Sequence, residues 1–294
     1  MYESIKQIVT TAEKKKQPIS SLIIDAEVAD SGVSREDVWN KMKRNLETMR
    51  AAVKKGETGK GVHSPTGLTG GEAIKVKKYR EQHKSLSGDA MMGAVQAALA
   101  TNEVNAALGV ICATPTAGSA GTMPGVIAAL EDRLHLSEDQ LIRFLFTAGG
   151  FGLVIANHAN IAGATGGCQA EVGSASAMAA AAAVEAAGGT PQQSSEALAI
   201  AISNLLGLVC DPIAGLVEVP CVKRNAIGTA NALVAADLAL AGCTSIIPAD
   251  ECIQAMDKVG RNLPSSLRET GIGGLAGTPT GQRIKARIFG KDVK

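Results

Sequence analysis

The chain has 294 residues and a mass of 30.0 kDa, and its 29 Lys and Arg against 28 Asp and Glu give a net charge of +1. This balance argues against a nucleic-acid-binding protein, because phosphate contacts require a clustered positive excess. With 46% hydrophobic, 19% charged and only 2% aromatic residues, the chain should form a packed core of small aliphatic side chains rather than remain disordered.

The first 60 residues are predicted to form a helical entry segment. Ser34-Arg35-Glu36-Asp37 resembles a capping box, and apolar residues at helical spacing follow it from Val38 to Val53. The N-terminus carries charges from its third residue and lacks the apolar run of a secretory signal. We therefore expect a cytoplasmic location.

A further helix is predicted over residues 88–108, and helix-start signals at Ser137, Thr190 and Pro248 predict three more. Ser176–Ala187 is an Ala-rich run that favours another helix, and strand-like alternation is scarce. The sequence thus predicts a mainly α protein. It should form a single compact domain over residues 1–294, with short Ala/Gly-rich helices joined by Gly/Ser/Thr/Pro loops.

Charge is scarce in the middle of the chain. Residues 91–220 contain only two Lys or Arg and ten Asp or Glu, so this stretch should be mostly buried, in its own fold or against a partner. Two charge-free runs, 104–130 and 144–170, are long enough to span a bilayer. Their prolines, glycines and amides, and the lack of aromatic belts, favour buried segments over membrane spans.

Two loops rich in Gly, Ser and Thr, at 63–71 and 114–125, could present N–H groups and hydroxyls to an anion such as a carboxylate. On composition alone, tight turns between packed helices explain them equally well.

Three cysteines lie beside glycines, prolines and carboxylates, namely Cys168, Cys210 and Cys221. The other three, Cys112, Cys243 and Cys252, lie in apolar or helical contexts typical of core thiols. The spacing matches neither a zinc finger nor a ferredoxin. Spacing alone therefore leaves both a metal site and buried structural thiols open.

Four long motifs resemble the α chain of the iron–sulfur-dependent bacterial L-serine dehydratases of the two-subunit type. They are HSPTGLTGG at 63–71, TPTAGSAGTMPG at 114–125, GGCQAEVGSASAMAAAA at 166–182 and GLVCDPIAGLVEVPCVKRNAIGTANA at 207–232. The resemblance covers nearly the whole chain.

This resemblance implies a [4Fe–4S] cluster held by Cys168, Cys210 and Cys221, which leaves one iron without a thiolate. That iron would act as a Lewis acid on the hydroxyl of L-serine, and the products would be pyruvate and ammonia. The resemblance also implies a separate β chain, so we expect a hetero-oligomer. Pyridoxal phosphate, the rival cofactor, needs a Schiff-base lysine, and residues 91–220 contain none.

The resemblance implies roles for further residues. His63 is the candidate catalytic residue, although the base could also come from the partner chain. The candidate substrate-binding residues are Ser64, Thr66, Gly67, Thr69, Ser119, Ala120, Gly121, Lys223 and Asn225. Arg224, which follows a predicted cluster ligand, could stabilise the negative charge of the cluster.

Three alternatives stay open at this point. A cysteine desulfidase-like iron–sulfur lyase would share similar cysteine motifs, and activity on L-cysteine would reveal it. A redox or sensor protein would show reversible one-electron chemistry without response to substrate. A cofactor-free helical scaffold would contain neither iron nor sulfide.

Overall fold

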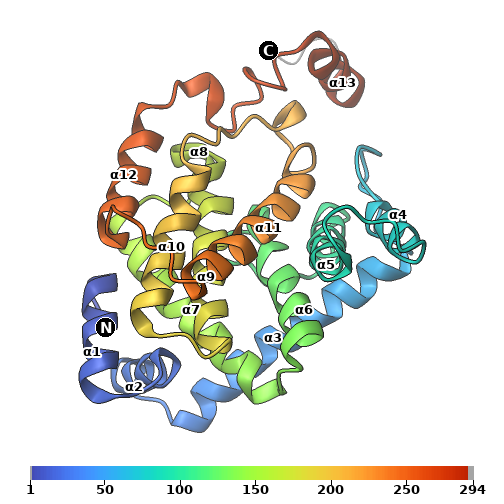
Figure 1. Ribbon diagram of the computed structural model, residues 1–294. Coiled ribbons are helices and arrows are strands. Elements are labelled where there is room, and N and C mark those ends of the chain that lie inside the picture. The colour runs from blue at the N-terminus through green and yellow to red at the C-terminus, as the bar shows by residue number, and fades with distance from the viewer. Residues whose placement is uncertain (1, 291–294) are drawn as a thin grey trace.

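The computed structural model describes residues 2–290, and within this range the protein has thirteen α-helices and no β-sheet (Figure 1). The helices are α1 (Ile5–Lys15), α2 (Ile19–Ser31), α3 (Arg35–Thr58), α4 (Glu72–Arg80), α5 (Asp89–Ala106), α6 (Thr122–Leu134), α7 (Glu138–His158), α8 (Gly163–Gly166), α9 (Ser174–Ala186), α10 (Pro191–Leu205), α11 (Cys221–Leu240), α12 (Ala249–Asn262) and α13 (Pro279–Phe289). Shorter helical turns are η1 (Ala117–Ser119), η2 (Gln169–Gly173), η3 (Ile213–Gly215) and η4 (Ser265–Leu267). The predicted mainly α, single compact fold is confirmed.

The helix starts follow the local signals of the sequence. Ser34 caps α3 by accepting from the N–H of Asp37 at 3.1 Å. Ser137 and Thr190 each complete a capping box, at the starts of α7 and α10. In these boxes the side chains satisfy N–H groups that have no partner inside the helix.

The Ala-rich helix α9 lies in the middle of the molecule (Figure 1), and its residues Ser174–Val184 are all buried. Helices α6, α7, α10 and α11 pack around it. Small residues make these contacts close: a Cβ on Gly152 of α7 would lie 2.5 Å from the Cε of Met178 of α9. The scarcity of aromatic residues therefore follows from a core in which helices approach through Ala and Gly.

Helix α7 is the one helix in residues 2–290 that is long and apolar enough to cross a membrane. In the fold, 67% of its apolar window is buried inside the protein. The run 144–170 thus supplies a core helix and the loop that follows it, as the sequence indicated.

Two half-buried carboxylates tie the N-terminal helices to the rest of the fold. Asp250 of α12 accepts from the N–H of Ile5 at 2.8 Å, and Glu185 of α9 accepts from the N–H of Ile19 at 2.7 Å. In Figure 1, α1 and α2 lie at the lower end of the molecule, whereas α8 and α13 lie at the upper end. The cysteine-bearing loops next to α8 and η3 are at this upper end.

Candidate metal centre

Three segments bring the predicted cysteine ligands to one end of the helical core. Cys168 follows α8 and immediately precedes η2, Cys210 lies in the loop after α10, and Cys221 is the first residue of α11. All three are buried free thiols. Of the three cysteines predicted to be core thiols, Cys252 of α12 belongs to the main hydrophobic core and Cys112 is half-buried, whereas Cys243 is exposed in the loop after α11, contrary to the prediction.

Glycines make room for these side chains. Gly167 has a φ of +78° and would clash through a Cβ with the carbonyl oxygen of Leu208, at 2.9 Å. A Cβ on Gly163 would lie 2.5 Å from Oε2 of Glu171 and 3.0 Å from Sγ of Cys210. The glycines around 163–167 are thus required by the close approach of a sulfur, a carboxylate and backbone.

The closest group of potential metal ligands consists of Cys168, Glu171 and Cys210. One ligand atom from each lies within 4.8 Å of the others. Glu171 belongs to the π-helical turn η2 and accepts a hydrogen bond from the Thr116 hydroxyl at 2.7 Å. Sequence reasoning missed Glu171, although it was one of few acidic residues in a low-charge stretch and lay inside a motif already singled out.

Hydrogen bonding and burial shift the pKa values of the three thiols in different directions. The hydrogen bond from Cys210 lowers the pKa of Cys168, and the nearby Arg224 guanidinium lowers it further. The same thiol–thiol contact, together with burial, raises the pKa of Cys210. Burial also raises the pKa of Cys221, with the negative charges of the site adding to it. Cys168 is therefore the thiol that ionises first, and thiolates are the form that binds metal.

Arg224 is the only cation in residues 2–290 that pairs with a carboxylate of the loop from Cys210 to Cys221, called the cysteine loop from here on. Its Nη2 lies 2.8 Å from Oδ1 of Asp211, and its Nη1 donates to the carbonyl of Val209 at 2.8 Å. Both charged side chains are largely buried. Because Arg224 also hydrogen-bonds Cys168, its charge offsets that of the thiolate.

The segment 263–277 crosses the cysteine loop. Cys210 donates its N–H to Leu267 at 2.9 Å and accepts from the N–H of Glu269 at 2.6 Å. Leu275 donates its N–H to Oδ2 of Asp211 at 2.7 Å. These contacts bring the Glu269 carboxylate near the thiols, where its charge helps raise the pKa of Cys210 and Cys221. Sequence patterns gave no signal for this placement.

The 63–71 loop is held against the same cysteine loop. Ser64 and Thr69 are buried and hydrogen-bond each other through the Ser64 N–H and the Thr69 carbonyl at 3.0 Å. The Thr66 hydroxyl donates to both carboxylate oxygens of Glu218, at 2.8 and 2.9 Å. Lys223 forms an ion pair with Glu72, just after the loop, at 2.6 Å. The predicted substrate loop therefore lies beside the segment between Cys210 and Cys221.

The 114–125 loop is joined to the site through Asn225. Ser119, Ala120 and Gly121 are buried. The side-chain oxygen Oδ1 of Asn225 accepts from the N–H groups of Gly121 at 3.0 Å and Thr122 at 3.2 Å. The Asn225 amide donates to the carbonyls of Gly118 and Cys221, at 2.7 and 3.0 Å. Asn225 thus binds backbone groups and the Thr122 hydroxyl, which is a positioning role, and its predicted contact with substrate stays a prediction.

His63 and Gly67 are exposed members of the 63–71 loop. The His63 ring packs against Gly70 and Gly71, and within residues 2–290 no hydrogen bond fixes its nitrogens. Its proposed catalytic role stays a prediction, as do the substrate contacts of the other loop residues.

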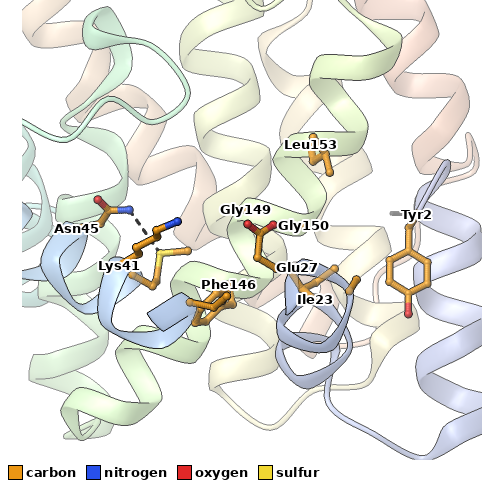
Figure 2. A pocket seen from close by; sticks show the side chains of 12 residues that line it. Tyr2, Ile23, Glu27, Lys41, Asn45, Phe146, Gly149, Gly150 and Leu153 are labelled. Atoms are coloured by element: carbon orange, nitrogen blue, oxygen red, sulfur yellow. Dashed lines mark hydrogen bonds between the residues drawn. The ribbon is translucent and has the colours of Figure 1, made fainter. Parts of the chain in front are cut away.

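A cavity of about 320 Å³ lies elsewhere, among helices α2, α3 and α7 (Figure 2). Its walls are mainly apolar, with Ile23, Met42 and Phe146 beside Glu27 and Lys41. None of the predicted site residues lines it, so the cysteine end remains the candidate site.

Fold and site together define a helical protein with buried thiols that could hold a metal, next to loops rich in Gly, Ser and Thr. Comparison with known families is specific: the family described as serine dehydratase alpha chain matches residues 4–276. The chain belongs to this family.

Three relatives illustrate the similarity. The chain is 58% identical over 290 residues to the probable L-serine dehydratase, alpha chain, of Bacillus subtilis, covering 99% of this chain and 96% of the relative. It is 71% identical over 205 residues to the protein of the same description from Latilactobacillus sakei, covering 70% and 98%. It is 43% identical over 285 residues to the L-serine dehydratase, alpha chain, of Peptoniphilus asaccharolyticus, covering 97% of each.

Proposed function

We propose that this protein is the catalytic α subunit of an L-serine dehydratase, a lyase that converts L-serine to pyruvate and ammonia. In this reaction serine loses its Cα proton and its hydroxyl group, and the resulting 2-aminoacrylate becomes an imine that water hydrolyses. The observation that supports the proposal best is the close approach of the buried Cys168 and Cys210 in a family member, with Cys221 near enough for the charge of Cys168 to raise its pKa.

The donor set fits a [4Fe–4S] cluster held by Cys168, Cys210 and Cys221. Soft thiolates are the ligands of such clusters, and the buried Arg224 beside Cys168 compensates negative charge there. The chemistry supplied by such a cluster is Lewis acidity at the iron that lacks a thiolate, directed at the departing hydroxyl of serine.

The protein's own residues would prepare the surroundings of that iron. Glu171, fixed by Thr116, lies next to two of the thiols and can hold a proton close to them. The 63–71 and 114–125 loops would orient the substrate carboxylate through hydroxyl and N–H groups. The segment 263–277 would limit the access of water from the side of Cys210.

Two further parts belong to the proposal. The relatives are named alpha chains, which supports a separate β chain as partner and a hetero-oligomeric enzyme. All six cysteines are free thiols, which supports the reducing environment of the cytoplasm.

Anaerobic reconstitution with iron and sulfide, with and without the β chain, tests the function. L-serine should change the electron paramagnetic resonance spectrum of the reduced cluster, and pyruvate should form in the same sample. Alanine at Cys168, Cys210 or Cys221 should abolish both iron binding and pyruvate formation. Cys252→Ala removes an equally buried thiol outside the site and should retain both.

A stable cluster that does not respond to L-serine would refute the dehydratase function in favour of a redox or sensor role. Turnover of L-cysteine in preference to L-serine would instead indicate a desulfidase.

A further inference from the structure

Serine enters its site as a zwitterion, so an enzyme that buries it must supply a partner for the ammonium group as well as for the carboxylate. A buried ammonium without an anionic or hydrogen-bonding partner is strongly disfavoured. The carboxylates around the candidate site can therefore be compared by the cations and hydrogen-bond donors that each already has.

Most of these carboxylates already have an ion-pair or hydrogen-bond partner within the protein. Asp211 pairs with Arg224, and Glu72 pairs with Lys223. Glu103 accepts from N–H groups at the start of α4. Glu171 is held by Thr116 and lies against the thiols.

Glu218 differs from Asp211 and Glu72 in having no cation partner, from Glu103 in accepting no backbone N–H, and from Glu171 in lying outside the group of thiols. It is only 6% exposed, yet within residues 2–290 no Lys, Arg or His nitrogen lies within 4.0 Å of its carboxylate. Its side-chain oxygens accept only from the Thr66 hydroxyl. One hydroxyl proton leaves most of the acceptor capacity of a carboxylate unused.

The position of Glu218 matches that of a substrate-binding group. It precedes Cys221 by three residues, in the loop that joins two of the predicted cluster ligands. Through Thr66 it contacts the 63–71 loop, where the Ser64 hydroxyl lies 3.2 Å from that of Thr66. Two basic side chains near this loop have other partners: Lys223 pairs with Glu72, and the exposed Arg287 donates to the Thr66 carbonyl at 3.5 Å.

We propose that Glu218 binds the α-ammonium group of the substrate, and that Thr66 positions its carboxylate. The inference rests on the proposed function, since it assigns one group of the same substrate. It also changes the role of Thr66, whose single proton is committed to Glu218 and is not free for the substrate carboxylate. A cationic substrate group would complete the charge balance of this buried carboxylate.

The test uses the reconstituted holoenzyme with its β chain. Glu218→Gln keeps the size of the side chain and can still accept from Thr66, but it removes the negative charge. We expect the KM for L-serine to rise about 10- to 100-fold, as for the loss of a hydrogen bond to a charged group, with a much smaller change in kcat. Thr66→Val, the matched control, leaves the carboxylate in place and should raise KM no more than about fivefold.

A second ligand separates ammonium binding from loop positioning. L-glycerate carries a hydroxyl where serine carries the ammonium, so its inhibition constant should be unchanged or lowered in Glu218→Gln. Calorimetric titration of L-glycerate and measurement of iron content give readouts that do not depend on turnover. Glu218→Asp, which retains the charge one methylene further back, should give a KM between those of wild type and Glu218→Gln.

Three results would overturn the inference: an unchanged KM in Glu218→Gln, equal losses in Glu218→Gln and Thr66→Val, or parallel weakening of L-serine and L-glycerate. Absence of pyruvate formation by the wild-type holoenzyme would refute the proposed function itself. An active wild type with an unaffected Glu218→Gln variant would refute only the role of Glu218. If Glu218→Gln lost iron or failed to fold, the Glu218→Asp and Thr66→Val comparison would decide.

Discussion

Replacing Asn225 by alanine tests whether this residue supports the site or binds the substrate. Its side chain is completely buried and makes five hydrogen bonds, to Gly121, Thr122 (two), Gly118 and Cys221. Each such bond contributes about 1 kcal/mol net, and a buried group left without a partner costs about 1–3 kcal/mol. Because some partners can rebond after relaxation, we expect Asn225→Ala to lower the free energy of unfolding by about 3–5 kcal/mol.

Urea denaturation of the cluster-free chain measures this loss. Asn204→Ala is the matched control, since the exposed Asn204 side chain makes one hydrogen bond, to Asn231, and its removal should cost less than about 1 kcal/mol. A loss below about 1 kcal/mol in Asn225→Ala, combined with a raised KM, would refute the positioning role and favour direct substrate contact.

Three further variants test other parts of the structure. Gly163→Ala should reduce iron content sharply with little change in helicity, because its Cβ would collide with the Cys210 sulfur and the Glu171 carboxylate. Gly149→Ala is the control: its Cβ meets no atom within 4 Å, so this variant should retain iron. Glu185→Ala should lower stability by about 1–2 kcal/mol in thermal unfolding, because it removes the cap of α2; an unchanged midpoint would contradict this. Burial raises the pKa of Glu103, so its stability contribution is complete below the ordinary glutamate pKa and is lost as pH rises through the raised value. The stability of wild type relative to Glu103→Gln should therefore fall as pH rises above the ordinary glutamate pKa in urea denaturation, and a constant difference would argue against the shift.

Local signals explain why the helices could be predicted. Ser137 and Thr190 cap helices through residues three positions away, so the whole motif is visible in a short stretch of sequence. The Ala-rich run of α9 likewise has few alternatives to a buried helix. The three candidate cysteine ligands could be singled out only through the resemblance, because their spacing alone matches no common metal motif.

Long-range pairing explains what sequence reasoning missed. Glu218 and Thr66 are 152 residues apart, and the 263–277 segment reaches Cys210 only through backbone hydrogen bonds. Nothing in the residue types around Glu269 indicates that its carboxylate lies near the thiols. Asn225 lay inside a recognised motif, but its role depends on which neighbouring groups point toward it, which only the folded arrangement reveals.

The crossing of the cysteine loop by segment 263–277 has a consequence for the order of assembly. A chain emerging from the ribosome presents all three thiols once residue 221 is exposed, but the partners of Cys210 and Asp211 are Leu267, Glu269 and Leu275, about 50 residues later. Until they arrive, the site lacks one wall, and an iron donor for the proposed cluster would find the thiols accessible. Maturation would then proceed in two stages, with metal delivered to an open half-site and sealed in by the last segment to fold.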